Sequence, residues 1–331
     1  TKPYLAFQAT TRAEWEVWRH SLQTKLWQLM GPFPYRVALD PEVLERTPCD
    51  GYVREKVVFN SEDAASVPAW VLVPNQRPAS GKFRTLLCLH GHNGGRAFGK
   101  DGPAGVTGDN PDKQKVITND NYDYAVQFAK HGYLTIAPDS RGFGERFDAK
   151  PTYGHRDPCN VNFLATSLLG HNLLALNLLD YIATVDYLLT RPDVDADRIG
   201  CMGLSFGGTG TMWLAALDER VKVACISGYL TSFKKYGIEM DNFCGSQYLP
   251  WLLRYADIPD LCGLIAPRPL LIEHGVEDKG FPIETTREAF AQLKKVYEII
   301  GEPQKVDMDE FQGGHRFSGR KAFDWFDKWL A

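Results

Sequence analysis

Residues 198–208 read RIGCMGLSFGG, and this stretch decides the fold. The apolar run 198–202 predicts a strand, and 208–217 predicts a helix. Between them, GLSFG at 203–207 follows the pattern G-x-S-x-G, in which a serine sits on a strained strand-to-helix turn. Flanking glycines let the backbone pass close to neighbouring strands. The stretch therefore predicts that Ser205 stands above a sheet, at a helix N-terminus, as a nucleophile.

Short apolar strands alternate with helices on both sides of this turn. Such alternation indicates βαβ units and an α/β fold, with a mostly parallel sheet and helices on both faces. Strands are expected at 52–60, 67–74, 85–89, 133–137, 198–202, 221–226, 270–273 and 305–311, and helices at 124–130, 171–189, 208–217, 284–300 and 320–330. Sites in such sheets lie beyond the carboxyl ends of the strands, so the loops after the strands should carry the chemistry.

The chain is expected to divide into an N-terminal helical extension, 1–50, and a catalytic domain, 51–331. Trp15, Trp18 and Leu22 have helical spacing within the extension. Three longer segments interrupt the domain near 94–121, 143–169 and 231–261. Each follows a strand, and long insertions are usually lids or binding loops. We expect all three at the edge of the sheet that carries the site.

Composition and charge exclude several kinds of partner. The 331 residues carry a formal net charge of −4 and no run of Lys or Arg, which argues against nucleic acid. No apolar stretch has membrane-spanning length, so no membrane partner is expected. The seven cysteines show no CxxC spacing, which favours reduced thiols and a cytoplasmic protein. A secreted form whose signal was removed before residue 1 stays open, and the sequence leaves the oligomeric state open.

A serine hydroxyl needs a base, and in G-x-S-x-G folds an acid and then a histidine follow the serine along the chain. Two histidines follow Ser205, namely His274 and His315. His315 is the expected base because it lies in a glycine-rich loop between the last strand and the last helix, whereas His274 ends a strand. The acid should follow strand 270–273, where Glu277 and Asp278 are both candidates and Asp278 is favoured.

The loop after strand 85–89 reads HGHNGG at 90–95 and is the expected source of an oxyanion donor. The backbone N–H groups of His92 and Phe206 are the predicted oxyanion hole. His90 and His92 also suggest a metal pair. A catalytic zinc needs three protein ligands, and no third ligand lies close in sequence. We therefore expect no metal and no cofactor.

Residues 139–146 read DSRGFGER and follow another strand. Their charges are expected to form a structural ion-pair cluster, although Arg141 and Glu145 are also candidates for the polar rim of a substrate pocket. Tyr229 and Trp251 are the further pocket candidates. The six aromatic residues of 231–261 indicate an apolar lid or a sugar-stacking surface, with packing the commoner role.

Over residues 50–331 the sequence resembles the dienelactone-hydrolase-like and acetyl xylan esterase-like branch of the α/β hydrolases. The resemblance is carried by LHGHNGG at 89–95, APDSRGFGER at 137–146, RPDVDADRIGCMGLSFGG at 191–208, GVEDKGFP at 275–282 and GGH at 313–315. It implies a Ser205–Asp278–His315 triad, no cofactor and hydrolysis of short-acyl esters of small molecules or saccharides. The family's G-x-x-D-x-x-x-P spacing is the main reason to prefer Asp278. His92 and the long segments 94–121 and 231–261 depart from the acetyl xylan esterases and leave the substrate open.

Two other functions compete with ester hydrolysis. A serine peptidase of the prolyl-oligopeptidase type shares the order of the triad, but its N-terminal propeller has no counterpart here, because residues 1–80 contain at most two expected strands. A non-catalytic binding protein of the same fold is disfavoured because serine, acid and histidine are all present.

Overall fold

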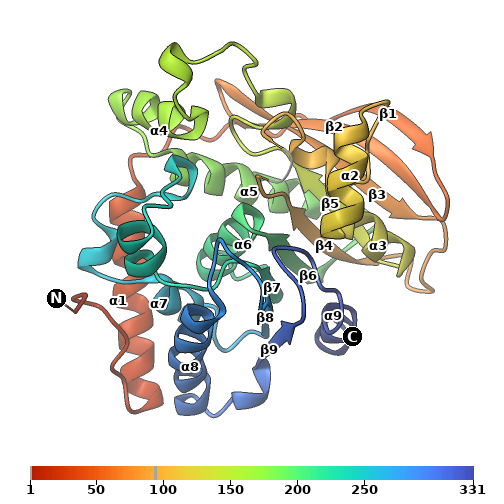
Figure 1. Cartoon of the computed structure of the whole chain (residues 1–331). Coiled ribbons are helices and arrows are strands. Elements are labelled where there is room, and N and C mark those ends of the chain that lie inside the picture. Colours follow the sequence, from red (N-terminus) through yellow and green to blue (C-terminus); the bar gives the residue numbers. More distant parts are fainter. Residues whose placement is uncertain (1, 93–94) are drawn as a thin grey trace.

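The computed structural model describes residues 2–92 and 95–331. In these residues a single sheet of nine strands crosses the molecule in the order β1-β2-β3-β5-β4-β6-β7-β8-β9 (Figure 1). Strands β1 to β3 and the β3–β5 pair are antiparallel, and every pairing from β5 to β9 is parallel. The strands are β1 (Glu42–Pro48), β2 (Tyr52–Glu62), β3 (Ala65–Pro74), β4 (Phe83–Leu89), β5 (Leu134–Pro138), β6 (Val194–Leu204), β7 (Val223–Ser227), β8 (Leu270–Gly275) and β9 (Val306–Phe311).

Helices cover both faces of the sheet. One apolar core joins it to α1 (Arg12–Met30), α5 (Leu173–Thr190), α6 (Phe206–Leu217), α7 (Ile258–Gly263) and α8 (Ile283–Ile299). The other joins it to α2 (Pro111–Asp120), α3 (Tyr124–Lys130) and α9 (Ala322–Trp329). Alternate strand residues serve the two cores, as Leu86 and Leu87 of β4 do. The α/β-hydrolase fold expected from the sequence is thus confirmed.

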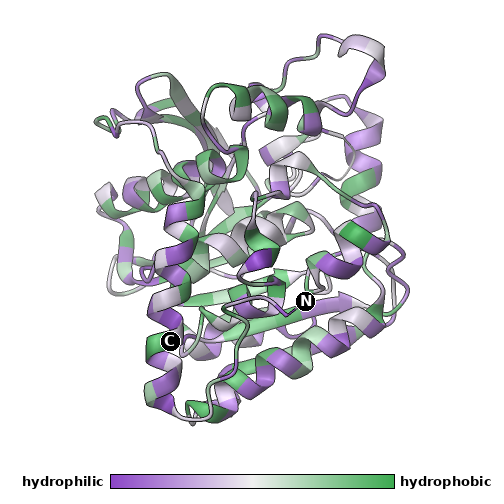
Figure 2. Cartoon of the chain, turned by 90° about the vertical axis from the view of Figure 1, so that its left-hand side faces the viewer, coloured by the Kyte–Doolittle hydropathy of each residue, from purple (hydrophilic) through white to green (hydrophobic). Residues whose placement is uncertain are grey.

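Hydropathy follows this layering. In Figure 2 the central strands are largely hydrophobic, whereas the outer helices alternate hydrophilic and hydrophobic residues. Contrary to the expectation that no apolar stretch has membrane-spanning length, helix α5 is long and apolar enough to cross a bilayer by length and composition. However, 78% of that stretch is buried within the fold, as expected for a core helix that is apolar all round.

The N-terminal segment differs from expectation at one point. Helix α1 forms where predicted, and Trp15, Trp18 and Leu22 are buried on it. Residues 42–48, which belong to the segment expected to be a helical extension, instead form β1, which pairs antiparallel with β2. Because nearly every residue of β1 is exposed, the strand has no alternating apolar pattern that sequence analysis could detect. The 1–50 segment is therefore not wholly helical, since it supplies the edge strand of the sheet.

The three insertions are also partly helical. Helix α2 lies in the first, α4 (Pro158–Leu168) in the second, and α7 begins in the third. Gly94, where the first insertion was expected to begin, lies outside the described residues. In Figure 1, α4 and the 231–261 segment lie side by side, and Gly245 N–H donates to Asn160 Oδ1 across 2.7 Å. Residues far apart in sequence thereby meet at one end of the molecule.

Candidate active site

Ser205 occupies a strained turn between β6 and α6. Its backbone lies in the left-handed region, with φ 63° and ψ −119°. A side chain at Gly207 would place Cβ 2.0 Å from the carbonyl oxygen of Leu89, so only glycine fits this close approach. The Ser205 N–H donates to Ser227 O at the end of β7, across 2.9 Å. Strain held in this way is typical of functional positions, as the G-x-S-x-G pattern predicts.

Asp278 and His315 form a hydrogen-bonded pair at the same edge of the sheet. His315 Nδ1 lies 2.6 Å from Asp278 Oδ2, and Asp278 is 5% exposed. Burial opposes ionisation of this carboxyl, but the hydrogen bond from His315 and the charge of His315 together lower the pKa of Asp278. An ionised Asp278 accepts the Nδ1 proton and leaves Nε2 free to act as a base.

The pair is placed next to the serine turn by Gly228. A Cβ at Gly228 would lie 3.0 Å from His315 Cε1, so the imidazole packs directly on this backbone. Gly228 follows Ser227, which accepts the Ser205 N–H. His315 also stacks on Phe281, with ring centroids 5.5 Å apart. The Gly228 backbone, the Phe281 ring and the Asp278 carboxylate thus all contact the imidazole and position it.

The competing residues lie elsewhere. His274 is fully buried below the acid loop, where Nε2 lies 2.7 Å from Phe281 O. Burial lowers the pKa of His274. Glu277 is exposed, next to Asp278 in sequence. The structure therefore pairs Asp278 with His315 near the Ser205 turn and leaves Glu277 and His274 outside that pair.

The loop after β4 rests directly on the serine turn. A Cβ at Gly91 would lie 2.6 Å from Leu204 O and 3.0 Å from Ser205 Cβ. Gly91 N–H itself donates to the hydroxyl of Tyr122 across 2.5 Å, so it is already engaged, and the N–H of His92 remains the predicted oxyanion donor of this loop. Phe206 begins α6, and N–H groups in the first turn have no partner within the helix.

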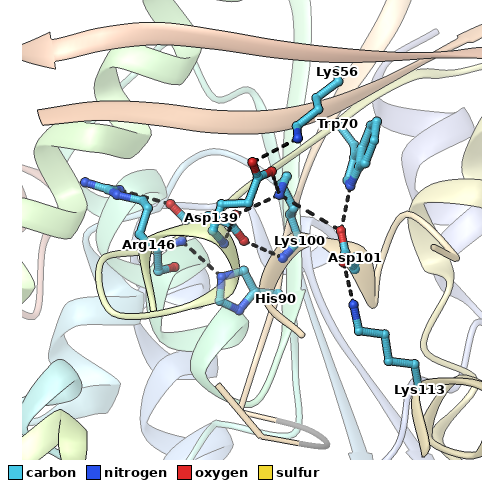
Figure 3. A network of polar contacts seen from close by, with 10 residues as sticks. Lys56, Trp70, His90, Lys100, Asp101, Lys113, Asp139 and Arg146 are labelled. Atoms are coloured by element: carbon cyan, nitrogen blue, oxygen red, sulfur yellow. Dashed lines mark hydrogen bonds and ion pairs between the residues drawn. The ribbon is translucent and has the colours of Figure 1, made fainter. Parts of the chain in front are cut away.

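His90 and His92 point to different neighbours. His90 is buried, and its Nε2 accepts the N–H of Ser140 across 3.0 Å (Figure 3). His92 instead reaches two thiols, with Nε2 3.2 Å from Cys244 Sγ and 3.6 Å from Cys159 Sγ. The two histidines therefore do not form a metal pair with each other. Neither thiol is near His92 in sequence, because Cys159 and Cys244 come from the second and third insertions.

A buried ion-pair cluster braces the loop after β5. Lys100 is 2% exposed, and its Nζ lies 2.8 Å from Asp139 Oδ2 and 2.5 Å from Glu145 Oε1 (Figure 3). Burial lowers the pKa of Lys100, but the charge and hydrogen bond of Asp139 outweigh it and raise the pKa overall. Lys56 reaches the other oxygen of Glu145 at 2.9 Å. The carboxylate of Glu145 is thus engaged in structure, as the expected ion-pair cluster requires.

The four residues proposed for a substrate pocket do not gather at one place. Arg141 pairs with Glu62 at 2.5 Å and with Asp180 at 2.9 Å, so it also belongs to a structural ion-pair cluster. Tyr229 is fully buried and packs edge-on against Phe281.

Trp251 differs, because it is 65% exposed and lines a cavity of about 250 Å³. The cavity wall is aromatic and aliphatic and comes from the 231–261 segment alone. It includes Phe233, Ile238, Phe243, Tyr248, Leu249 and Trp251. From Phe233, rings in contact run through Tyr236 and Phe281 to His315. The third insertion therefore forms a hydrophobic hollow, and its Tyr236 packs on Phe281, the ring that stacks on the imidazole.

The chain is similar in sequence and in fold to known hydrolases. The sequence model of the Abhydrolase family matches residues 1–324. The chain belongs to this family. The resemblance to α/β hydrolases is thereby confirmed. The Abhydrolase relatives include YtaP of Bacillus subtilis, a protein classed as a hydrolase, which is 26% identical over 94% of this chain and 100% of its own length.

Solved structures share the fold. One is a protein of Bacteroides fragilis classed as an acetyl xylan esterase, with a TM-score of 0.77 and 22% identity over 94% of this chain and 79% of its own. Another is a glucuronoyl esterase from Solibacter usitatus, with a TM-score of 0.66 and 17% identity over 100% of this chain and 96% of its own. At these identities the likeness establishes the α/β-hydrolase fold of this Abhydrolase member.

Proposed function

We propose that this protein is a serine carboxylic ester hydrolase that acts on short-acyl esters, including esters of carbohydrates. The Asp278–His315 hydrogen bond beside the strained Ser205 turn is the observation that carries the proposal. The similarity to proteins named as acetyl xylan and glucuronoyl esterases supports a carbohydrate ester as the substrate class.

The chemistry follows from the roles of the three side chains. His315 Nε2 takes the proton of the Ser205 hydroxyl as its oxygen attacks the ester carbonyl. The N–H groups of His92 and Phe206 hold the oxyanion that forms. As the tetrahedral intermediate collapses, the protonated His315 gives its proton to the departing alcohol and an acyl-enzyme remains. Water then attacks with the same assistance, which releases the carboxylic acid and restores Ser205.

The third insertion offers a place for the rest of the substrate. Its cavity is apolar and carries the exposed indole of Trp251, a surface suited to a short acyl group or to the face of a sugar ring. The charges of Arg141 and Glu145 are already paired within the protein, so we do not assign them to substrate recognition. We therefore assign specificity to the 231–261 segment.

A Ser205→Ala variant tests the proposal. Hydrolysis of p-nitrophenyl acetate should fall by about 10⁶-fold in kcat, the scale for loss of the nucleophile in a serine hydrolase triad. A fluorophosphonate probe should label the wild type and not the variant, while circular dichroism shows both folded. Aminoacyl-naphthylamides should not be cleaved. A pure variant that keeps a tenth of the wild-type rate would refute Ser205 as nucleophile, and amide cleavage without ester cleavage would favour a peptidase.

A further inference from the structure

Three soft ligands meet beside the serine turn, and none takes part in ester hydrolysis through its side chain. His92 follows β4, Cys159 is the second residue of α4, and Cys244 lies in the third insertion. Their ligand atoms all lie within 4.8 Å of one another. Cys159 is 1% exposed, and the other two are partly buried. The cluster is therefore largely enclosed, with some exposure at His92 and Cys244.

The distances match those of a tetrahedral metal site. A zinc ion with Zn–S of about 2.3 Å and Zn–N of about 2.0–2.1 Å sets neighbouring S and N ligands roughly 3.5 Å apart. His92 Nε2 lies 3.2 Å from Cys244 Sγ and 3.6 Å from Cys159 Sγ. Two thiolates and an imidazole form a donor set that favours zinc over magnesium or calcium. We propose that His92, Cys159 and Cys244 bind a zinc ion, with a fourth position left to water.

The surroundings suit a sulfur ligand that carries negative charge. Arg96 Nε lies 3.2 Å from Cys159 Sγ, and Arg96 is itself paired with Asp157. With zinc bound, Arg96 would remain as an outer partner of the Cys159 sulfur.

The ligands are held in place without the metal. Asn160, next to Cys159, accepts the N–H of Gly245, next to Cys244. A Cβ at Gly245 would lie 2.7 Å from Cys159 O, so the two backbones are in direct contact. The His92 ring packs on Phe143 and Phe206, with centroids 5.3 Å and 5.1 Å away. A bound ion would link the loop after β4 to the second and third insertions. This is a structural role separate from the serine chemistry.

Cobalt binding tests the site directly. Reduced protein freed of metal by a chelator is titrated with Co²⁺, and we expect one equivalent to give the visible and near-ultraviolet bands of tetrahedral thiolate ligation. Zn²⁺ should abolish these bands by displacement. Cys159→Ser and Cys244→Ser should each remove the bands, whereas Cys49→Ser, which changes a partly buried thiol in another part of the fold, should keep them. Ser205→Ala should bind Co²⁺ like the wild type, so the result does not depend on esterase activity.

Two results would overturn the zinc site. One is reduced, folded wild-type protein that takes up no Co²⁺ or Zn²⁺ while all seven thiols react with a thiol reagent after unfolding. The other is protein isolated with two fewer reactive thiols and a Cys159–Cys244 disulfide that re-forms in preference to metal uptake. Circular dichroism of the metal-free variants shows whether each is folded. If Cys159→Ser is unfolded, Cys244→Ser provides the same comparison at the less buried sulfur.

Discussion

Replacing Asp278 by Asn probes the candidate site most sharply, because the change keeps the size of the side chain and removes only its charge. Asp278 Oδ2 accepts from His315 Nδ1 at 2.6 Å. Oδ1 accepts the N–H groups of Gly280 and Phe281 at 2.8 Å and 3.0 Å. An asparagine must keep its oxygen toward these two donors, because the opposite orientation would set its NH₂ against both.

The NH₂ of the asparagine then faces His315 Nδ1 and forces that nitrogen to accept. The imidazole proton moves to Nε2, which can no longer take the Ser205 proton. The same tautomer error costs about 10⁴-fold in kcat in a serine protease triad. At 1.36 kcal/mol per tenfold, this is a loss of about 5 kcal/mol of transition-state stabilisation. We expect a loss of that scale here.

The assay is steady-state hydrolysis of p-nitrophenyl acetate, with the rate of fluorophosphonate labelling as a second measure of Ser205 reactivity. Glu277→Gln is the matched control, since it removes an exposed carboxylate one residue away. The control should retain activity within a factor of about two to three, as surface changes usually do. The reasoning fails if Glu277→Gln is the more damaging change, or if Asp278→Asn stays within tenfold of the wild type.

Three further predictions concern stability and specificity. Lys100→Met should lower the free energy of unfolding by about 3–5 kcal/mol in urea denaturation, because it leaves Asp139 and Glu145 without their buried partner. Lys130→Met removes one partner of an exposed ion pair and should lower it by less than about 1 kcal/mol. Equal effects of the two substitutions would contradict a stabilising role for the Lys100 cluster. Burial raises the pKa of Glu273 to about 7, so between pH 4.5 and 7 the native state holds a proton that the unfolded chain has lost. The free energy of unfolding of the wild type should therefore fall by roughly 3 kcal/mol as the pH rises from about 4.5 to 7. Glu273→Gln should lack this decline. If the variant shows the same pH dependence of stability as the wild type, Glu273 is not the group responsible. On ester substrates kcat/KM should fall from acetate or butyrate to palmitate. In a lipase groove each buried methylene would instead add about 0.8 kcal/mol of binding free energy and raise kcat/KM with chain length. A preference for palmitate would therefore exclude the short-acyl proposal.

The sequence predicted those parts of the site that local pattern determines. The turn at Ser205 follows from glycines that only a close backbone approach requires, and His315 follows from its loop after the last strand. In this fold the strands and helices that carry these residues follow one another in a fixed order along the chain. The edge strand β1 escaped prediction because its residues are exposed on both faces and carry no period. Lys100 escaped because a lysine in a glycine-rich segment looks solvated, yet tertiary contacts bury it.

The thiols escaped prediction for a related reason. Cys159 and Cys244 lie in different insertions, and no spacing relates them to each other or to His92. Their only shared feature in sequence is that each belongs to a segment expected at the carboxyl edge of the sheet. Proximity there depends on how α4 packs on the 231–261 segment, which long-range backbone contacts decide. A sequence motif cannot reveal such a cluster, because its members come together only when the chain folds.

These features together describe how the loop after β4 is held. Its side chains diverge, with His90 bonded to Ser140 beside the Lys100 cluster and His92 directed to the two thiols. The backbone between them lies on the serine turn, with Gly91 fixed by Tyr122. An N–H that is to stabilise an oxyanion must be in place before charge develops, because reorganisation during the reaction would consume the benefit. Contacts on both sides of the loop would supply that rigidity, and under our proposals the buried ion pairs and the zinc ligands would both hold this one loop in place.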